Sequence, residues 1–151
     1  MEKLVFRDET FEPAASLLLK LAAGENESFG NNASGQFVGL YQLHLSGTEA
    51  TPTKKLAVLD HGLSSDDERL RKVCIDALEK MLSTGNFSRG GGAERIGAAN
   101  KLEDWSAGTY GEIYDYYRQA LQRIGAIAEN PMDCFCDQAK SIIASLSLIH
   151  I

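Results

Sequence analysis

The stretch SSDDERLRKVCIDALEKMLSTGN, residues 64–86, predicts the clearest helix of the chain and with it the fold class. It starts with a serine cap and an acidic first turn, and both favour the N-terminus of a helix. Gly85 is expected just beyond the helix, because glycine readily adopts the left-handed conformation of a helix end. Between these ends, apolar side chains recur every three or four residues and fall on one stripe: Leu70, Val73, Cys74, Ala77, Leu78, Met81 and Leu82.

Helical periodicity continues on the N-terminal side of this stretch. One helix is expected over residues 10–24. The segment QFVGLYQLHL, residues 36–45, predicts a second helix with His44 on its apolar stripe. A third helix is expected to open at Thr51-Pro52, since proline suits the first helical position after a threonine cap.

The C-terminal side predicts a long loop followed by two further helices. Residues 86–108 include RGGGAERIGAAN and are interpreted as a Gly-rich loop. Thr109 and Glu112 have the spacing of a capping box, in which each side chain accepts a hydrogen bond from the other's backbone. The segment MDCFCDQAKSIIASL, residues 132–146, predicts the last helix. The helix that opens at Thr109 is expected to bury Ile113, Tyr117, Ala120, Leu121, Ile124 and Ile127.

These elements predict an all-α fold, an irregular array of about six helices of repeat type. No segment shows the two-residue alternation that indicates a strand. A chain of 151 residues has the length of one domain with a sizeable core. We expect residues 1–145 to form a partial helical-repeat domain.

The charge balance argues against a nucleic-acid partner. The 21 acidic and 15 basic residues give a formal net charge of −6, whereas nucleic-acid-binding proteins concentrate lysine and arginine on one surface. No apolar run approaches the roughly 18 residues that a membrane span requires. We therefore expect no nucleic-acid partner and no membrane partner. The partners that we expect are other proteins, or other domains of the same parent chain.

The three cysteines favour a reduced, cytoplasmic setting, because an odd number does not form a complete disulfide framework. Cys134 and Cys136 stand beside Asp133 and Asp137, which raises the possibility of a metal. Structural zinc takes four ligands, and residues two apart on a helix point about 200° apart. Small side chains in a helical core are the better interpretation, and no metal site is predicted.

No catalytic or cofactor-binding residue is predicted. The glycines at 90–92 follow a helix instead of a strand, and no Gly-Lys-Ser/Thr follows them. A flexible connector therefore explains them better than a phosphate-binding loop does. His44 and His61 do not stand at a readable spacing from a Ser or Cys nucleophile, which nucleophilic catalysis requires.

Aromatic residues near the helix that opens at Thr109 are the candidate partner-binding residues. Tyr110 and Tyr114, four residues apart, share one face of that helix, and Trp105 is close in sequence. Aromatic side chains on exposed helix faces are common anchors for protein partners. The competing hypothesis is that this face packs against a neighbouring helix of the same array.

Residues 52–82, PTKKLAVLDHGLSSDDERLRKVCIDALEKML, resemble a helix pair from a HEAT-type α-solenoid. A shorter helix, a tight acidic turn and a longer helix carrying Arg71, Ala77 and Leu78 are similar to that pattern, with Cys74 where alanine is usual. The resemblance covers about a fifth of the chain. It implies stacked helix pairs, each of which buries its apolar face against its neighbours.

A second resemblance covers residues 31–59, NNASGQFVGLYQLHLSGTEATPTKKLAVL, and residues 104–121, DWSAGTYGEIYDYYRQAL. These segments look like helical arms of large bacterial multidomain proteins, in which a P-loop signalling ATPase or another effector precedes a sensing solenoid. The resemblance implies ligand or protein sensing by this segment, with catalysis elsewhere in the parent chain.

The last six residues, LSLIHI at 146–151, resemble a translated transposon mosaic end that is used as a sequencing adapter. The alternative is a genuine helix end, because Ile142 and Ile143 precede them with an apolar pattern. On the adapter interpretation, 146–151 is a non-native tail and the natural protein continues differently.

Three hypotheses of function follow, and the third is a structural spacer without a specific ligand, which a surface that lacks an exposed apolar patch would support. The first is a non-enzymatic protein-interaction or sensor module from a larger cytoplasmic bacterial protein. The second is a small helical enzyme or ligand-binding domain that uses the Gly-rich loop at 86–108 as a lid. A concave pocket with converging polar groups beside that loop would favour the second hypothesis.

Overall fold

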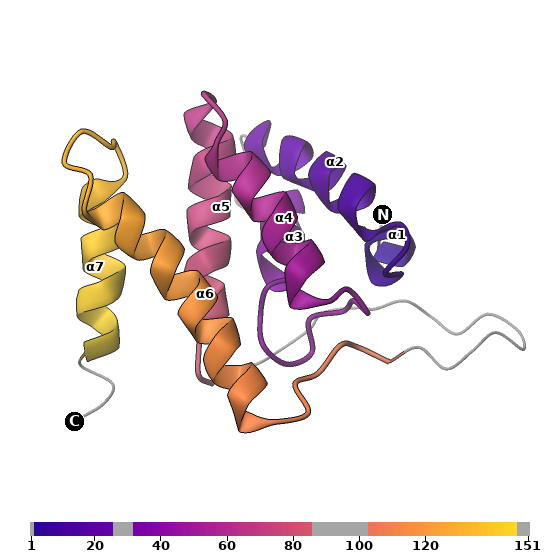
Figure 1. Ribbon diagram of the computed structural model, residues 1–151. Coiled ribbons are helices and arrows are strands. Elements are labelled where there is room, and N and C mark those ends of the chain that lie inside the picture. The colour runs from indigo at the N-terminus through magenta and orange to yellow at the C-terminus, as the bar shows by residue number, and fades with distance from the viewer. Residues whose placement is uncertain (1, 26–31, 86–102, 148–151) are drawn as a thin grey trace, which may run out of the picture.

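The computed structural model describes residues 2–25, 32–85 and 103–147, and over these ranges the chain forms helices and no strand. The helices are α1 (Glu2–Phe6), α2 (Phe11–Ala23), α3 (Ala33–Gly39), α4 (Pro52–Leu63), α5 (Glu68–Met81), α6 (Tyr110–Ala128) and α7 (Cys136–Ser147) (Figure 1). The predicted all-α class is confirmed.

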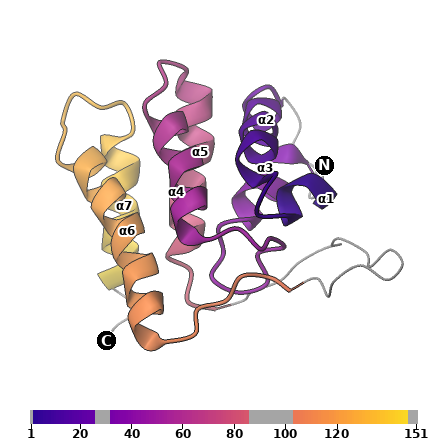
Figure 2. The same cartoon turned by 45° about the vertical axis from the view of Figure 1, so that its right-hand side comes forward.

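The helices stack as three pairs, α2 with α3, α4 with α5, and α6 with α7 (Figure 2). Neighbouring pairs make the main contacts between pairs: α2 packs on α4 and α5, α3 packs on α5, and α6 packs on α5. The short helix α1 packs on α2. The middle pair therefore separates the two outer ones, and α5 contacts helices of both.

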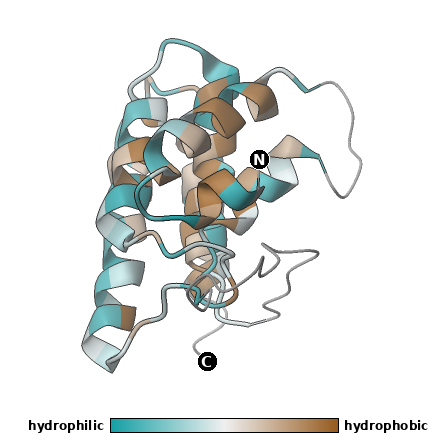
Figure 3. Cartoon of the chain, turned by 90° about the vertical axis from the view of Figure 1, so that its right-hand side faces the viewer, coloured by the Kyte–Doolittle hydropathy of each residue, from teal (hydrophilic) through white to brown (hydrophobic). Residues whose placement is uncertain are grey.

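Helix α5 carries the predicted apolar stripe into the core. Val73, Cys74, Ala77, Leu78 and Met81 are all buried. Ile75 is also buried although it lies off the predicted stripe. The reason is that α5 has packed helices on several sides, so more than one of its faces is covered. In Figure 3 the hydrophobic parts of the ribbons lie mostly where helices face one another.

The sequence predicts where helices start more accurately than where they end. The capping box at Thr109 and Glu112 is present, and α4 begins at Pro52 after Thr51, as predicted. The cap of α5 is Asp67, whose carboxylate accepts a hydrogen bond from the Arg69 backbone N–H at 2.9 Å, so the predicted serine cap is wrong. Helix α5 ends at Met81, four residues before Gly85.

The predicted helix over residues 36–45 is wrong beyond Gly39, where α3 ends. The chain then turns irregularly, with Leu45 at φ 56° and Gly47 at φ 72°. His44 is exposed instead of packed on an apolar stripe. Long-range contacts fix this segment, which we call the 41–50 segment: Trp105 donates its backbone N–H to the carbonyl of Thr48 at 2.8 Å.

Contacts distant in sequence also hold helix α1, which the sequence did not predict. The backbone carbonyl of Phe6 accepts hydrogen bonds from the Glu49 N–H at 2.8 Å and from the Thr48 hydroxyl at 3.1 Å. Nearby, Lys54 Nζ lies 2.7 Å from Asp8 Oδ2. A five-residue helix is too short to be stable alone, so these tertiary contacts account for it.

Helices α4 and α5 approach closely at Gly62. A Cβ atom built on this glycine would lie 2.4 Å from Cys74 Sγ and 2.9 Å from Leu19 Cδ2. Both distances are below van der Waals contact, so only glycine fits between these two side chains. Gly62 therefore sets the spacing of α4 against α5 and against α2.

A partly buried ion pair joins α5 to the turn between α6 and α7. The Arg71 guanidinium donates to the Asp133 carboxylate, and the two side chains are only 18% and 11% exposed. The same guanidinium lies over the Phe135 ring, 5.3 Å from its centroid. Asp133 also accepts a hydrogen bond from the Phe135 backbone N–H at 2.9 Å, which shapes the turn.

Replacing Asp133 with alanine should lower the free energy of unfolding by about 3 kcal/mol, because it leaves the partly buried Arg71 charge without its carboxylate. Chemical denaturation measures the change. The matched control is Asp115→Ala, which breaks an ion pair with Arg118 whose two side chains are each 62% exposed. That control should cost no more than about 0.5 kcal/mol. Equal losses in the two variants would contradict the role given to the Arg71–Asp133 pair.

Candidate functional site

A groove of about 740 Å³ lies between α4 and α6. Helix α4 forms one wall, α6 forms the other, and Trp105 from the preceding connection also lines it. The lining residues are Thr51, Pro52, Thr53, Leu56, Ala57, Asp60, Trp105, Glu112, Asp115, Tyr116, Gln119 and Arg123.

The α4 wall of this α4–α6 groove is uncharged along most of its length. It consists of two threonines, a proline, a leucine and an alanine before Asp60 is reached. Leu56 and Ala57 lie one turn beyond the helix start, so their side chains give the wall an apolar middle. This wall therefore suits an apolar surface on a bound molecule.

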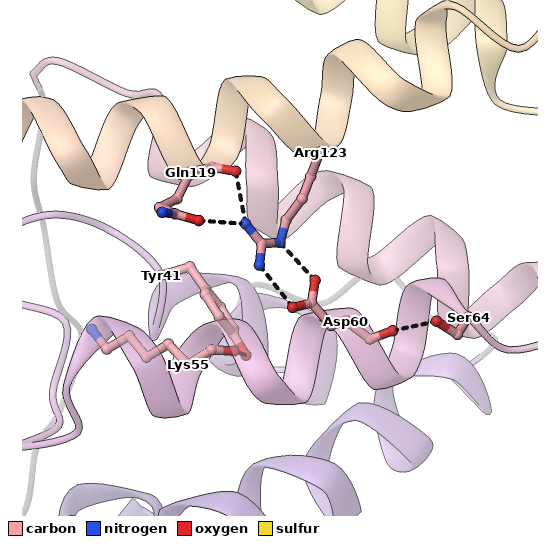
Figure 4. A network of polar contacts seen from close by, with 6 residues as sticks. All are labelled: Tyr41, Lys55, Asp60, Ser64, Gln119 and Arg123. Carbon is pink, nitrogen blue, oxygen red and sulfur yellow. Dashed lines mark hydrogen bonds and ion pairs between the residues drawn. The ribbon is translucent and has the colours of Figure 1, made fainter.

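Arg123 connects the two walls (Figure 4). Its Nε and Nη2 donate to the two carboxylate oxygens of Asp60 at 2.6 and 2.7 Å. Its Nη1 donates to the side-chain and backbone oxygens of Gln119 at 2.9 and 3.0 Å. A bidentate ion pair of this kind fixes the orientation of both side chains and also balances their charges. Arg123 is therefore committed to the protein itself, and its charge is balanced by Asp60.

The α6 wall carries two further carboxylates. Glu112 Oε2 accepts a hydrogen bond from the backbone N–H of Thr109 at 3.3 Å, as the capping box requires, and another from the backbone N–H of Gly108 at 2.6 Å. Asp115 pairs with Arg118, one turn along α6. Both acidic residues are exposed and line the groove, so this wall is acidic.

Trp105 is half-buried against the interior instead of standing free. Its ring stacks on Tyr116 with 5.9 Å between centroids. Tyr116 is only 1% exposed, and its hydroxyl donates to the carbonyl of Tyr41 at 2.6 Å. These contacts make Tyr116 the buried tyrosine of α6, whereas the prediction placed Tyr117 in the core and Tyr117 is half-buried.

A fully buried lysine lies behind the groove. Lys55 Nζ donates to the Ser46 hydroxyl at 3.1 Å and lies 5.8 Å from the centroid of the Trp105 ring. Burial lowers the pKa of Lys55 to about 7, and the nearby Asp104 carboxylate opposes that shift. Figure 4 shows the side chain running along α4 toward its N-terminal end, with Tyr41 beside it. The Tyr41 hydroxyl donates to the Lys55 carbonyl at 3.2 Å.

Sequence reasoning missed Lys55 and the Asp60–Arg123 pair. Lys55 shares a helical face with the buried Leu59, four residues later, and this spacing was the available signal. Asp60 and Arg123 stand 63 residues apart, and no local pattern connects them.

The structure separates the predicted partner-binding aromatic residues into two places. Tyr110 and Tyr114 project from α6 and are 79% and 64% exposed. At about 100° per helical residue, they lie roughly opposite the side of α6 that carries Glu112 and Gln119. Trp105 lines the groove and does not join the two tyrosines. We call Tyr110 and Tyr114 the tyrosine face.

The three cysteines are free thiols that differ in burial. Cys74 is buried, and burial raises the pKa of its thiol to about 12. Cys136 is buried and donates to the Ala128 carbonyl at 3.3 Å, while Cys134 is exposed. Within the described ranges, no three His, Cys, Asp or Glu side chains are grouped so that they could hold a metal ion.

Among the helices of residues 2–25, 32–85 and 103–147, none is both long and apolar enough to cross a membrane. The glycines at 90–92 and most of the predicted lid lie outside the described residues, as does the end of the chain from residue 148. Comparison with protein-family models, with curated proteins and with solved structures found no match to this chain.

Proposed function

We propose that this chain is a non-enzymatic protein-interaction or sensor module of a larger cytoplasmic bacterial protein, built as a HEAT-like array. The observation that carries the proposal is the tyrosine face. Two large aromatic side chains one helical turn apart are left exposed on the longest helix described. Tyrosine gives large contact area at a low entropic cost, and this makes it a frequent anchor of protein interfaces.

The order of the helix pairs supports the same proposal. An array whose main contacts join neighbouring pairs has two open ends, as repeat proteins do. At the α2 end, Leu17 and Leu21 are about half exposed, and they lie four residues apart on one helix face. At the other end lies the exposed Ile143 of α7. Both ends therefore offer apolar surface to a partner or to adjacent domains of the parent chain.

The test uses a photo-crosslinking amino acid in the intact gene, expressed in its own cells. Placed at Tyr110 or Tyr114, it should give one discrete protein adduct, or an intramolecular crosslink to another domain. The control position is Gln122, which is exposed on a different side of α6. Equal labelling at the control position, or no adduct at all, would refute the tyrosine face as a partner surface.

The double variant Tyr110→Ser/Tyr114→Ser distinguishes binding from folding. Because both side chains are exposed, the free energy of unfolding should change by less than about 0.5 kcal/mol. The same variant should lose the partner, which co-purification from those cells would measure. A large loss of stability would mean that the tyrosines pack in the native state and do not form a free surface.

The α4–α6 groove favours a second candidate function, a ligand-binding domain or small enzyme with residues 86–108 as a lid. Its volume falls within the roughly 300–1,000 Å³ of small-molecule pockets, and Trp105 in its wall belongs to the loop itself. Deleting residues 88–100 tests this hypothesis. A lid is required for ligand affinity or turnover, whereas a connector can be shortened without loss of partner binding.

A further inference from the structure

The two walls of the α4–α6 groove differ in chemistry. The α4 wall is uncharged up to Asp60 and has an apolar middle at Leu56 and Ala57, while the α6 wall presents Glu112 and Asp115. The side chain of Trp105 adds apolar surface. A complementary molecule therefore needs an apolar side and a cationic side.

The charges along the groove do not cancel. Its lining includes three carboxylates and one guanidinium, and that guanidinium is held by Asp60. Glu112 and Asp115 are left as the acidic pair of the groove. Arg118 balances Asp115 from outside the lining, but this pair is 62% exposed on both sides. Exposed ion pairs of this kind contribute little to stability, so a cationic group of a partner can replace Arg118 beside Asp115.

The spacing of the acidic pair indicates the form of the partner. Residues three apart on a helix have Cβ atoms about 5–6 Å apart. Basic side chains three or four residues apart on a second helix have the same separation, so the two helices can pair side by side. Lysine and arginine also have long apolar stems, which pack on aromatic and aliphatic walls while the charged ends stay near carboxylates.

We infer that the α4–α6 groove binds a Lys- or Arg-bearing amphipathic helix of a partner protein. The apolar face of that helix packs on Leu56, Ala57 and Trp105, and its basic side chains meet Glu112 and Asp115. This inference rests on the proposed function as an interaction module, and it adds the chemical class of a partner at a site separate from the tyrosine face.

Trp105 is the only tryptophan of the chain and lines this groove, so its fluorescence reports on binding. The probe is an amphipathic peptide of leucine and lysine, of roughly 14 residues or about 21 Å as a helix. It should shift the Trp105 emission and bind more weakly as salt is raised, because salt screens exposed charges. Matched peptides carry glutamate or glutamine in place of lysine, and neither should bind comparably.

The double variant Glu112→Gln/Asp115→Asn should weaken binding of the lysine peptide about tenfold or more. Glutamine at 112 retains the capping box, so α6 should still start at Thr109. The control Glu12→Gln/Glu79→Gln removes two exposed carboxylates on α2 and α5 and should leave the affinity unchanged. Circular dichroism of both variants establishes that they are folded.

Three results would overturn the inference: no shift of Trp105 emission with millimolar lysine peptide, equal affinity for the glutamine peptide, or equal weakening by both double variants. None of these results bears on the tyrosine face, since crosslinking at Tyr114 tests that surface independently. A crosslink at Tyr114 without peptide binding would leave the proposed function intact and remove the groove partner alone.

Discussion

Replacing Gly62 with alanine should destabilise the protein by about 2–3 kcal/mol, the usual cost of forcing extra volume into a packed core. The new methyl group would lie 2.4 Å from Cys74 Sγ and 2.9 Å from Leu19 Cδ2. Relief requires α4 to move away from both α5 and α2, or both side chains to leave their packed positions. Denaturant unfolding, fitted for midpoint and slope, measures the loss.

The control is Gly125→Ala in α6, where an added Cβ meets no heavy atom within 4 Å. This substitution should stabilise the protein by up to about 1 kcal/mol, because alanine is the better helix former. The two alanines therefore act in opposite directions for a reason found only in the tertiary structure. A loss at both positions would point to a general effect of the methyl group and contradict the close approach at Gly62.

A double-mutant cycle with Cys74→Ala identifies the contact. Removing the sulfur should relieve the overlap. The loss of unfolding free energy in the double variant should therefore be smaller than the sum of the two single losses, by at least about 1 kcal/mol. Additive losses would show that Leu19 or the backbone limits the space, and not Cys74.

Replacing Lys55 with methionine should stabilise the protein at pH 6 by about 3 kcal/mol or more, because methionine does not have a charge to bury. The folded-state pKa of Lys55 is lowered to about 7, whereas lysine in an unfolded chain titrates near 10.5. Between these values the unfolded chain holds a proton that the folded chain has released. The wild type therefore gains stability as pH rises from 7 to about 10, at up to about 1.4 kcal/mol per pH unit.

The difference in unfolding free energy between Lys55→Met and the wild type should therefore decrease from pH 7 upward and be close to zero at about pH 10. Urea unfolding of both proteins at pH 6, 7.5 and 9 measures the difference. Lys20→Met, which removes the same charge from an exposed position of α2, is the control. A difference between wild type and Lys55→Met that stays constant with pH would mean that Lys55 keeps its proton in the folded state.

The helices that the sequence predicted well have signals within one or two turns. The start of α4 is fixed by Pro52, the start of α6 by the capping box at Thr109, and the core face of α5 by its own periodicity. Each signal depends on side chains that contact their own helix, so it is already present in the local sequence. The all-α class follows from these elements together.

The elements that sequence reasoning missed depend on contacts between distant residues. Helix α1 is held by Glu49 and Thr48, and the irregular turn after Gly39 is held partly by Trp105. The groove has the same origin, since Asp60 and Arg123 meet only when α4 and α6 are in place. The helical spacing predicts that Tyr110 and Tyr114 share one face, but it predicts neither the exposure of that face nor the burial of Trp105.

The stacking of the pairs determines how a disturbance at one end of the molecule could reach the other. Helices α2 and α3 make their main contacts with the middle pair, and α6 makes its own with α5. A second connection runs through the 41–50 segment, where Tyr116 of α6 binds the Tyr41 carbonyl. Mechanical coupling between the ends therefore has two routes, one of packed helix and one of hydrogen-bonded loop. A substitution that weakens only one of these two sets of contacts would leave the other set to couple the two ends.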